Sequence, residues 1–242
     1  MAERTLLMLH GLGATSGVWA DVQAELDWPG RVVAPDLAGH GSAPWSGDYT
    51  VGALAAAASA VLEANEPTVI VGHSLGGGVG LALASGFFRP AVHAVLGLGI
   101  KTSWSEADVA GMAAVAAKGV RWVDDRDGAI TRFRRNAGLD GLIADDHPAV
   151  TDAVVEDGGR WRVAQDPATF AQQPLDMVGL MAAAQCPVAL GAGEHDAMAA
   201  EAELARFTDA PRIAAGRGHN VQTEDPGWVV AQLRDLVATL PG

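Results

Sequence analysis

The sequence predicts an α/β fold in which helices cover both faces of a mostly parallel sheet of about six strands. Short runs rich in branched apolar residues recur along the chain, at residues 5–9, 31–34, 68–71, 92–100, 187–190 and 212–215. The segments between these runs carry apolar residues at helical spacing, and this alternation is typical of a parallel sheet with helical crossovers. Because such crossovers are right-handed, they place helices on both faces.

The last helix expected in the chain is the most clearly marked. Asp225 can cap its N-terminus, and Pro226 suits its first turn. Its apolar stripe consists of Val229, Val230, Leu233, Leu236 and Val237. A similar spacing of Val51, Leu54 and Ala58 predicts an earlier helix.

One long segment, residues 104–185, contains no convincing strand. It carries helical patterns around 109–117 and 130–137, and it is dense in Asp and Arg. A set of ordinary crossover helices is the alternative, but so long a connection between consecutive strands is far beyond the usual length. We therefore expect a helical cap at 104–185, inserted into a core formed by residues 1–103 and 186–242.

A strand, a tight turn and a helix are expected around Ser74. Gly72-His73-Ser74-Leu75-Gly76 follows the apolar run 68–71 and precedes an apolar helical stretch. A nucleophile elbow needs small residues beside the serine, because its backbone is strained and the neighbouring chain packs closely around the turn. The pentapeptide alone occurs by chance in such a chain, so its context between strand and helix carries the prediction.

A serine hydroxyl needs a base, and the base needs an acceptor that fixes its tautomer. Asp196 follows the apolar run 187–190, and His219 lies on a glycine-rich loop after 212–215. With Ser74, both lie beyond carboxyl ends of expected strands, the edge at which open α/β sheets place their sites. The chain order Ser, Asp, His also fits, so these three residues are the candidate triad.

Each triad candidate has a simpler alternative. Asp196 could cap the helix that follows it, and His219 could be a surface-loop histidine. Glu194 and His195 compete with Asp196 for the role of the acid. We rank them lower, since the loop pattern after this strand favours the position of Asp196.

Acyl transfer also requires donors for the developing oxyanion, usually two backbone N–H groups. Leu75, directly after the nucleophile, provides one. Leu12, in the His10-Gly11-Leu12-Gly13 loop after the first strand, is best placed to provide the second. His10 itself is interpreted as structural, tying this loop down through a ring hydrogen bond.

Taken together, five motifs of this sequence resemble those of the α/β-hydrolase family. They are the elbow, the His10-Gly11 loop, the 36–41 turn and the loops of Asp196 and His219. The resemblance covers nearly the whole chain and is nearest to small bacterial esterase-like members with a helical cap. It implies a sheet of family strands 3–8, because the chain begins at what would be the third strand. A serine nucleophile argues against the haloalkane dehalogenase and epoxide hydrolase branches of the family.

The resemblance implies a serine hydrolase that cleaves a small carboxylic ester or thioester through an acyl-enzyme intermediate. The same triad serves carbon–carbon bond hydrolases, lactonases and acyltransferases in this family, so these stay alternatives. A non-catalytic small-molecule receptor is a further alternative of a different class, although the triad is whole.

Charge, cysteine content and residue spacing argue against several partners and cofactors. The net charge of −13 disfavours nucleic acid and anionic membrane surfaces. Cys186 is the only cysteine, so no internal disulfide can form, and no His, Cys and carboxylate spacing indicates a metal site. We expect no cofactor, no membrane insertion, a cytoplasmic location and a bacterial source. The oligomeric state does not follow from the sequence.

The resemblance also implies that the segment 104–185 roofs the active site and selects the substrate. Its candidates for an apolar pocket lining are Trp104, Trp122, Phe133, Trp161, Phe170 and Met177, although each is individually better explained by core packing. Arg132, Arg134 and Arg135 could hold an anionic group of the substrate. A solvated helix face, neutralised by nearby aspartates, is the simpler explanation of the three arginines.

Overall fold

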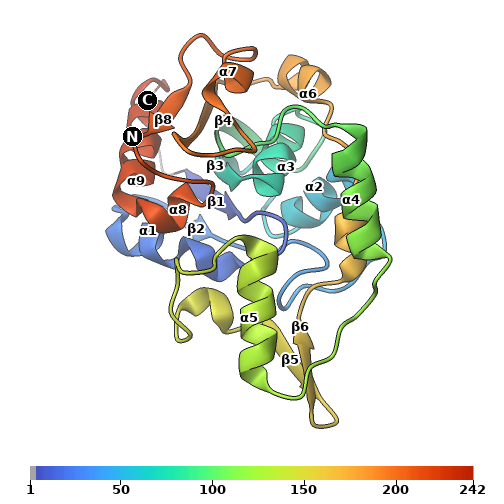
Figure 1. The fold of residues 1–242 in the computed structure, drawn as a ribbon. Coiled ribbons are helices and arrows are strands. Elements are labelled where there is room, and N and C mark those ends of the chain that lie inside the picture. Colours follow the sequence, from blue (N-terminus) through green and yellow to red (C-terminus); the bar gives the residue numbers. More distant parts are fainter. Residues whose placement is uncertain (1–3, 242) are drawn as a thin grey trace.

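The computed structural model describes residues 4–241, and six parallel strands form its central sheet (Figure 1). The strands lie in the order β2-β1-β3-β4-β7-β8, and each neighbouring pair is parallel. Their bounds are β1 Thr5–Leu9, β2 Val32–Val33, β3 Pro67–His73, β4 Ala91–Leu98, β7 Val188–Gly193 and β8 Arg212–Ala214. The predicted parallel sheet is confirmed. The expected core also includes residues 1–3 and 242, which lie outside the described residues.

The strand ends differ from the prediction where the backbone conformation changes. The run expected to reach residue 100 ends at Leu98, because Gly99 has a φ of +61° and leaves the extended conformation. The run 31–34 contributes just the two-residue edge strand β2. By contrast, β3 extends to His73 and brings the chain directly to Ser74.

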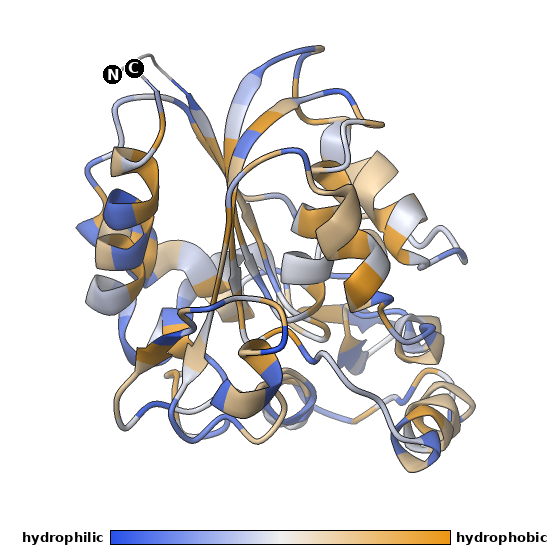
Figure 2. Cartoon of the chain, turned by 90° about the horizontal axis from the view of Figure 1, so that it is seen from above, coloured by the Kyte–Doolittle hydropathy of each residue, from blue (hydrophilic) through white to orange (hydrophobic). Residues whose placement is uncertain are grey.

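Helices cover both faces of the sheet, as predicted. Figure 2 shows the largely apolar strands between the two helical layers. One layer contains α1 (Ala20–Glu25), α8 (Val221–Glu224) and α9 (Pro226–Ala238). The other contains α2 (Val51–Ser59), α3 (Leu75–Leu83), α6 (Met177–Ala183) and α7 (Glu201–Leu204). Each layer buries a separate apolar cluster against the strands.

The predicted start of the last helix is confirmed. The Asp225 carboxylate accepts a hydrogen bond from the Trp228 N–H at 3.0 Å, and Pro226 occupies the first helical position. An aspartate N-cap satisfies a backbone donor that the helix itself leaves unpaired. Pro226 adds no further unpaired donor at this end, because it has no N–H.

The segment 104–185 contains helices and also a β-hairpin, so the expectation that it contains no strand is wrong. Its helices are α4 (Glu106–Ala116), α5 (Arg126–Ala137), η2 (Pro148–Val150), η3 (Pro167–Ala171) and α6. The hairpin pairs β5 (Val154–Asp157) with β6 (Arg160–Val163) in an antiparallel register. Gly158 and Gly159, with φ of +58° and +78°, form the two-residue turn that such a hairpin needs.

Part of this segment packs on the sheet. Ile130 and Phe133 of α5 share the apolar cluster of Leu6 and Met8 in β1. Near the C-terminal end of the segment, Met177 of α6 belongs to the apolar cluster on the opposite face of the sheet. The division into a core at 1–103 and 186–242 and a cap at 104–185 therefore stays a prediction, and the two parts share buried apolar contacts.

Among residues 4–241, no helix is both long enough and apolar enough to cross a membrane.

Candidate active site

Ser74 lies at a sharp turn between β3 and α3. Its backbone has φ +51° and ψ −115°, and Asn65 is the other non-glycine residue with a positive φ in the described chain. A conformation of this kind costs on the order of 1–3 kcal/mol and persists when the surrounding structure holds it. The Ser74 N–H donates to the Leu98 carbonyl at 2.7 Å, and the Ser74 carbonyl accepts from the N–H groups of Gly77 and Gly78. The turn is therefore held from both sides.

Two glycines make room for this turn. A Cβ atom added at Gly76 would overlap the Leu9 carbonyl oxygen, and one added at Gly72 would overlap the Gly76 carbonyl oxygen. Both neighbours are backbone atoms of buried elements, which cannot rotate away as a side chain could. The packing reason for small residues around the elbow, expected from the sequence, thus applies at both positions.

Gly76→Ala is expected to lower the free energy of unfolding by about 3 kcal/mol, because its methyl group would be forced into the backbone of β1. Gly52→Ala is the matched control. Gly52 lies near the start of α2 with open space around it, so alanine should be neutral or stabilising there by up to about 1 kcal/mol. Urea unfolding of both variants measures the difference, and equal stabilities would contradict the packing argument.

His219 and Asp196 lie together beyond the ends of β8 and β7. The His219 Nδ1 and the Asp196 Oδ2 are 2.8 Å apart, and the Asp196 side chain is fully buried. Burial is the largest single influence and opposes ionisation of this carboxyl group. The hydrogen bond and the charge of His219, together with the N–H of Met198, outweigh burial and hold the pKa of Asp196 below its usual value. A buried carboxylate is thus kept charged against the ring.

The charged carboxylate defines the imidazole tautomer of His219. Because an ionised Asp196 can accept but not donate, the proton lies on Nδ1 of His219. The other ring nitrogen, Nε2, is then unprotonated and able to accept a proton. His219 and Ser74 line the same pocket, as a nucleophile and its base must.

The competitors of Asp196 take other roles. The Glu194 carboxylate accepts a hydrogen bond from the Gly216 N–H at 2.7 Å, and His195 is exposed. Asp196 does not cap the next helix, because α7 begins at Glu201 and its N-cap is Ala200. Its Oδ1 instead accepts from the N–H of Met198 at 2.8 Å, in the turn before that helix. One carboxylate oxygen thus organises the following turn while the other binds His219.

The two predicted oxyanion donors, Leu12 and Leu75, line the same pocket as Ser74. Neither N–H donates a hydrogen bond to an acceptor among residues 4–241. Leu75 is the first residue of α3, so its N–H carries the partial positive charge of a helix N-terminus. A Cβ added at Gly11 would lie 3.3 Å from the Ser74 Cβ, so the loop of Leu12 runs directly against the elbow.

His10 has the structural position expected from the sequence. Its Nε2 accepts a hydrogen bond from the Leu37 N–H at 2.9 Å, and its Nδ1 is 2.8 Å from the Gly11 carbonyl oxygen. Burial lowers the pKa of His10, so the ring is neutral and joins the loops after β1 and β2. Asp36, in the second loop, accepts from the N–H groups of Ser16 and Ser42. These contacts hold the loop of Leu12 in place.

His73 was missed by the sequence analysis. Its ring is buried against the His219 ring, with centroids 4.6 Å apart, and its Nε2 donates to the His219 carbonyl at 2.9 Å. Burial, followed by the charge of His219, lowers the pKa of His73 to about 3. The signal that could have found it is its position directly before Ser74 at the end of a buried strand.

The pocket at Ser74 has a volume of about 400 Å³, within the range of small-molecule sites. Its further lining includes Lys101, Trp104, Met112, Arg135, Asn136, Leu175 and Met198. Of the expected lining residues, Trp104 is present, whereas Phe133 and Met177 are buried in the two apolar clusters. Phe170 lines a different cavity. The pocket is therefore mixed in polarity, with aromatic, aliphatic and cationic parts.

No group of three or more His, Cys, Asp or Glu side chains within residues 4–241 is arranged to hold a metal ion. Cys186 is half-buried, and burial raises the pKa of its thiol to about 11. The thiol is consequently protonated and a weak nucleophile at neutral pH.

The sequence profile of the alpha/beta hydrolase family matches residues 6–232. The chain belongs to this family. The solved structures similar to it include E-2-(acetamidomethylene)succinate hydrolase, at a TM-score of 0.78 and 18% identity over 98% of this chain and 92% of that one. The Mycobacterium tuberculosis esterase Rv0045c is similar at a TM-score of 0.73 and 23% identity, covering 99% of this chain and 87% of that one.

Sequence relatives match a shorter stretch. Lipase LipV of Mycobacterium tuberculosis is 38% identical over 83 residues, which is 33% of this chain and 31% of that protein. The pimeloyl-[acyl-carrier protein] methyl ester esterase of Neisseria meningitidis is 40% identical over 86 residues, 35% of this chain and 26% of the relative. The matched stretch thus spans about a quarter to a third of each of these relatives.

Proposed function

We propose that the protein hydrolyses a small carboxylic ester or thioester through an acyl-enzyme intermediate on Ser74. The observation that carries this proposal is the strained Ser74 at the end of β3 in one pocket with His219, whose ring is oriented by the buried Asp196. The lipase and methyl ester esterase names of two sequence relatives support ester chemistry.

In this mechanism, the Ser74 Oγ attacks the carbonyl carbon of the substrate while the Nε2 of His219 takes the hydroxyl proton. The carbonyl oxygen becomes an anion, which the N–H groups of Leu12 and Leu75 stabilise. The tetrahedral intermediate collapses, and the alcohol or thiol leaves with the proton from His219. Water then attacks the acyl-enzyme with His219 again as base, and the acid is released as Ser74 is restored.

The first test is labelling with a fluorophosphonate, followed by intact-mass measurement and peptide mapping. One adduct per chain, located on Ser74, is expected, because an activated serine attacks the phosphorus while other hydroxyls do not. In parallel, p-nitrophenyl esters of increasing acyl length should be hydrolysed, with a limit set by the pocket of about 400 Å³.

The outcomes separate the alternatives. Labelling of Ser74 without ester turnover would contradict the ester proposal and favour a lactonase, a carbon–carbon bond hydrolase or an acyltransferase on the same triad. Absence of labelling would contradict an activated Ser74 altogether and favour a small-molecule receptor.

A further inference from the structure

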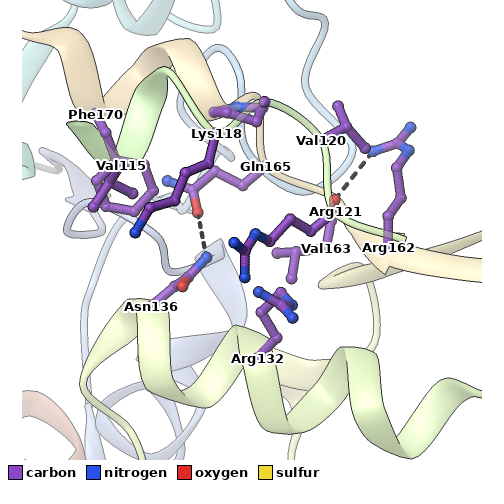
Figure 3. Close-up of a pocket in the computed structure, with 12 residues that line it drawn as sticks. Val115, Lys118, Val120, Arg121, Arg132, Asn136, Arg162, Val163, Gln165 and Phe170 are labelled. Atoms are coloured by element: carbon purple, nitrogen blue, oxygen red, sulfur yellow. Dashed lines mark hydrogen bonds between the residues drawn. The ribbon is translucent and has the colours of Figure 1, made fainter. Parts of the chain in front are cut away.

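A second cavity lies within the segment 104–185 and adjoins the Ser74 pocket. Its volume is about 210 Å³, several times the roughly 30 Å³ that a water molecule occupies. It is formed by the end of α4, the loop after it, α5, β6 and η3 (Figure 3). Asn136 of α5 lines both this cavity and the Ser74 pocket, so the two spaces adjoin at this side chain.

Four of the twelve residues that line this second cavity are cationic. They are Lys118, Arg121, Arg132 and Arg162, and we call the space they line the basic cavity. None of its lining residues in the described chain is acidic, although the protein has a net charge of −13. Within residues 4–241, none of the four cations forms an ion pair with a carboxylate. The local charge is therefore opposite to that of the whole molecule.

The three arginines of the α5 helix, considered together in the sequence analysis, diverge in the structure. Arg134 forms an ion pair with Asp145, and Arg135 lines the Ser74 pocket. Arg132 points into the basic cavity, where it meets Lys118 and Arg121 from the opposite wall (Figure 3). The helix therefore supplies one cation to each of three environments instead of one solvated face.

The side chains of the basic cavity are short of acceptors. The Nε of Arg132 is buried and has no hydrogen-bond partner among the described residues. An unpaired buried donor is costly, and cations that converge on one space repel one another. Arg162 is fixed at the rim by stacking on the Trp45 ring at 4.7 Å and by a hydrogen bond to the Val163 carbonyl at 3.1 Å. An anion with several acceptor oxygens would relieve both costs at once.

We propose that the basic cavity binds a phosphate group of the substrate, whose acyl group lies at Ser74; this inference rests on the proposed function. A phosphate monoester carries a charge of about −1.5 to −2 and three acceptor oxygens, which match several converging cations better than one carboxylate does. Guanidinium groups suit such oxygens through paired hydrogen bonds. Both spaces have Asn136 in their linings, so we assign the phosphate to the substrate: a ligand that extends from Ser74 past this side chain would reach the basic cavity.

The test compares acetyl-coenzyme A with S-acetyl-N-acetylcysteamine. Both contain the same thioester and adjoining amide, but just the first carries phosphate groups. We expect a kcat/KM at least tenfold higher for acetyl-coenzyme A. The double variant Arg121→Gln/Arg132→Gln should reduce that preference at least tenfold, or about 1.4 kcal/mol, and leave the truncated thioester within twofold. Higher salt should weaken the preference in the wild type, because it screens exposed charges such as Lys118 and Arg121.

Arg126→Gln is the matched control. Arg126 is also on α5 and exposed, but it does not line the basic cavity, so loss of its charge should leave the preference unchanged. Equal rates for the two thioesters, or a preference that the double variant keeps, would overturn the inference about the basic cavity. In that case, turnover of the truncated thioester would still uphold the proposed function. Should neither thioester nor p-nitrophenyl ester be hydrolysed, both proposals fail.

Calorimetry with inorganic pyrophosphate distinguishes the source of the phosphate. Binding that the double variant loses is expected, together with competition against the phosphate-bearing thioester. Pyrophosphate binding without any preference between the thioesters would mean that a free phosphate compound occupies the basic cavity, and the assignment to the substrate would be wrong.

Discussion

Ser74→Ala should abolish ester hydrolysis, with kcat falling by about 10,000-fold or more, because the variant lacks the atom that forms the acyl-enzyme. The fold should survive the change. The N–H and carbonyl of residue 74 make the hydrogen bonds that hold the turn, and alanine keeps both groups. Alanine is also no larger than serine, so the close contact with the loop of Gly11 is not tightened.

The measurement is steady-state hydrolysis of a p-nitrophenyl ester together with thermal unfolding of the same preparation. Ser85→Ala is the matched control, because Ser85 is buried and lies just beyond the other end of α3, where its hydroxyl donates to the Ala82 carbonyl. Wild-type activity is expected for that variant. Full activity in Ser74→Ala would remove the nucleophile from the proposal, whatever the unfolding temperature.

Much of the fold could be predicted because parallel strands buried on both faces leave a strong pattern. Residues 69–71 of β3 are fully buried, so branched apolar residues occur there without alternation and stand out in the sequence. Strand ends were less predictable, as at Gly99, because the sequence does not reveal which glycine adopts a positive φ.

The hairpin of 154–163 was missed for a different reason. Its four-residue strands carry charged residues as well as apolar ones, and this weak alternation was read as part of a helical segment. The adjacent glycines Gly158 and Gly159 were the available signal, since paired positive φ values favour a two-residue turn. Local turn chemistry would have found what hydrophobic spacing did not.

The candidate site followed from chain order and strand ends, but its supporting contacts did not. Ser74, Asp196 and His219 each follow a strand of one parallel sheet, so their common edge could be inferred from the sequence. The contact of His73 with His219 joins residues far apart in the chain through ring packing. The basic cavity likewise requires the hairpin to bring Arg162 near Arg132, and no local pattern encodes that approach.

Asp196→Asn should lower kcat by about 1,000- to 10,000-fold while the protein stays folded. Asparagine has nearly the same shape, and its amide oxygen can still accept from the Met198 N–H as Oδ1 of Asp196 does. The amide nitrogen, however, would face Nδ1 of His219, and an amide nitrogen donates hydrogen bonds but does not accept them. Nδ1 must then become the acceptor, which moves the ring proton to Nε2 and leaves no base toward Ser74.

Glu194→Gln is the control that separates this effect from a general loss of charge beside β7. The Glu194 carboxylate accepts from the Gly216 N–H, and a glutamine carbonyl can do the same, so activity within about twofold of wild type is expected. For Asp196→Asn, kcat should fall with little change in KM, because Asp196 orients the base and does not line the pocket. If Glu194→Gln were the damaging change and Asp196→Asn were tolerated, the acid would be Glu194, and the 2.8 Å contact between Asp196 and His219 would be structural instead of catalytic.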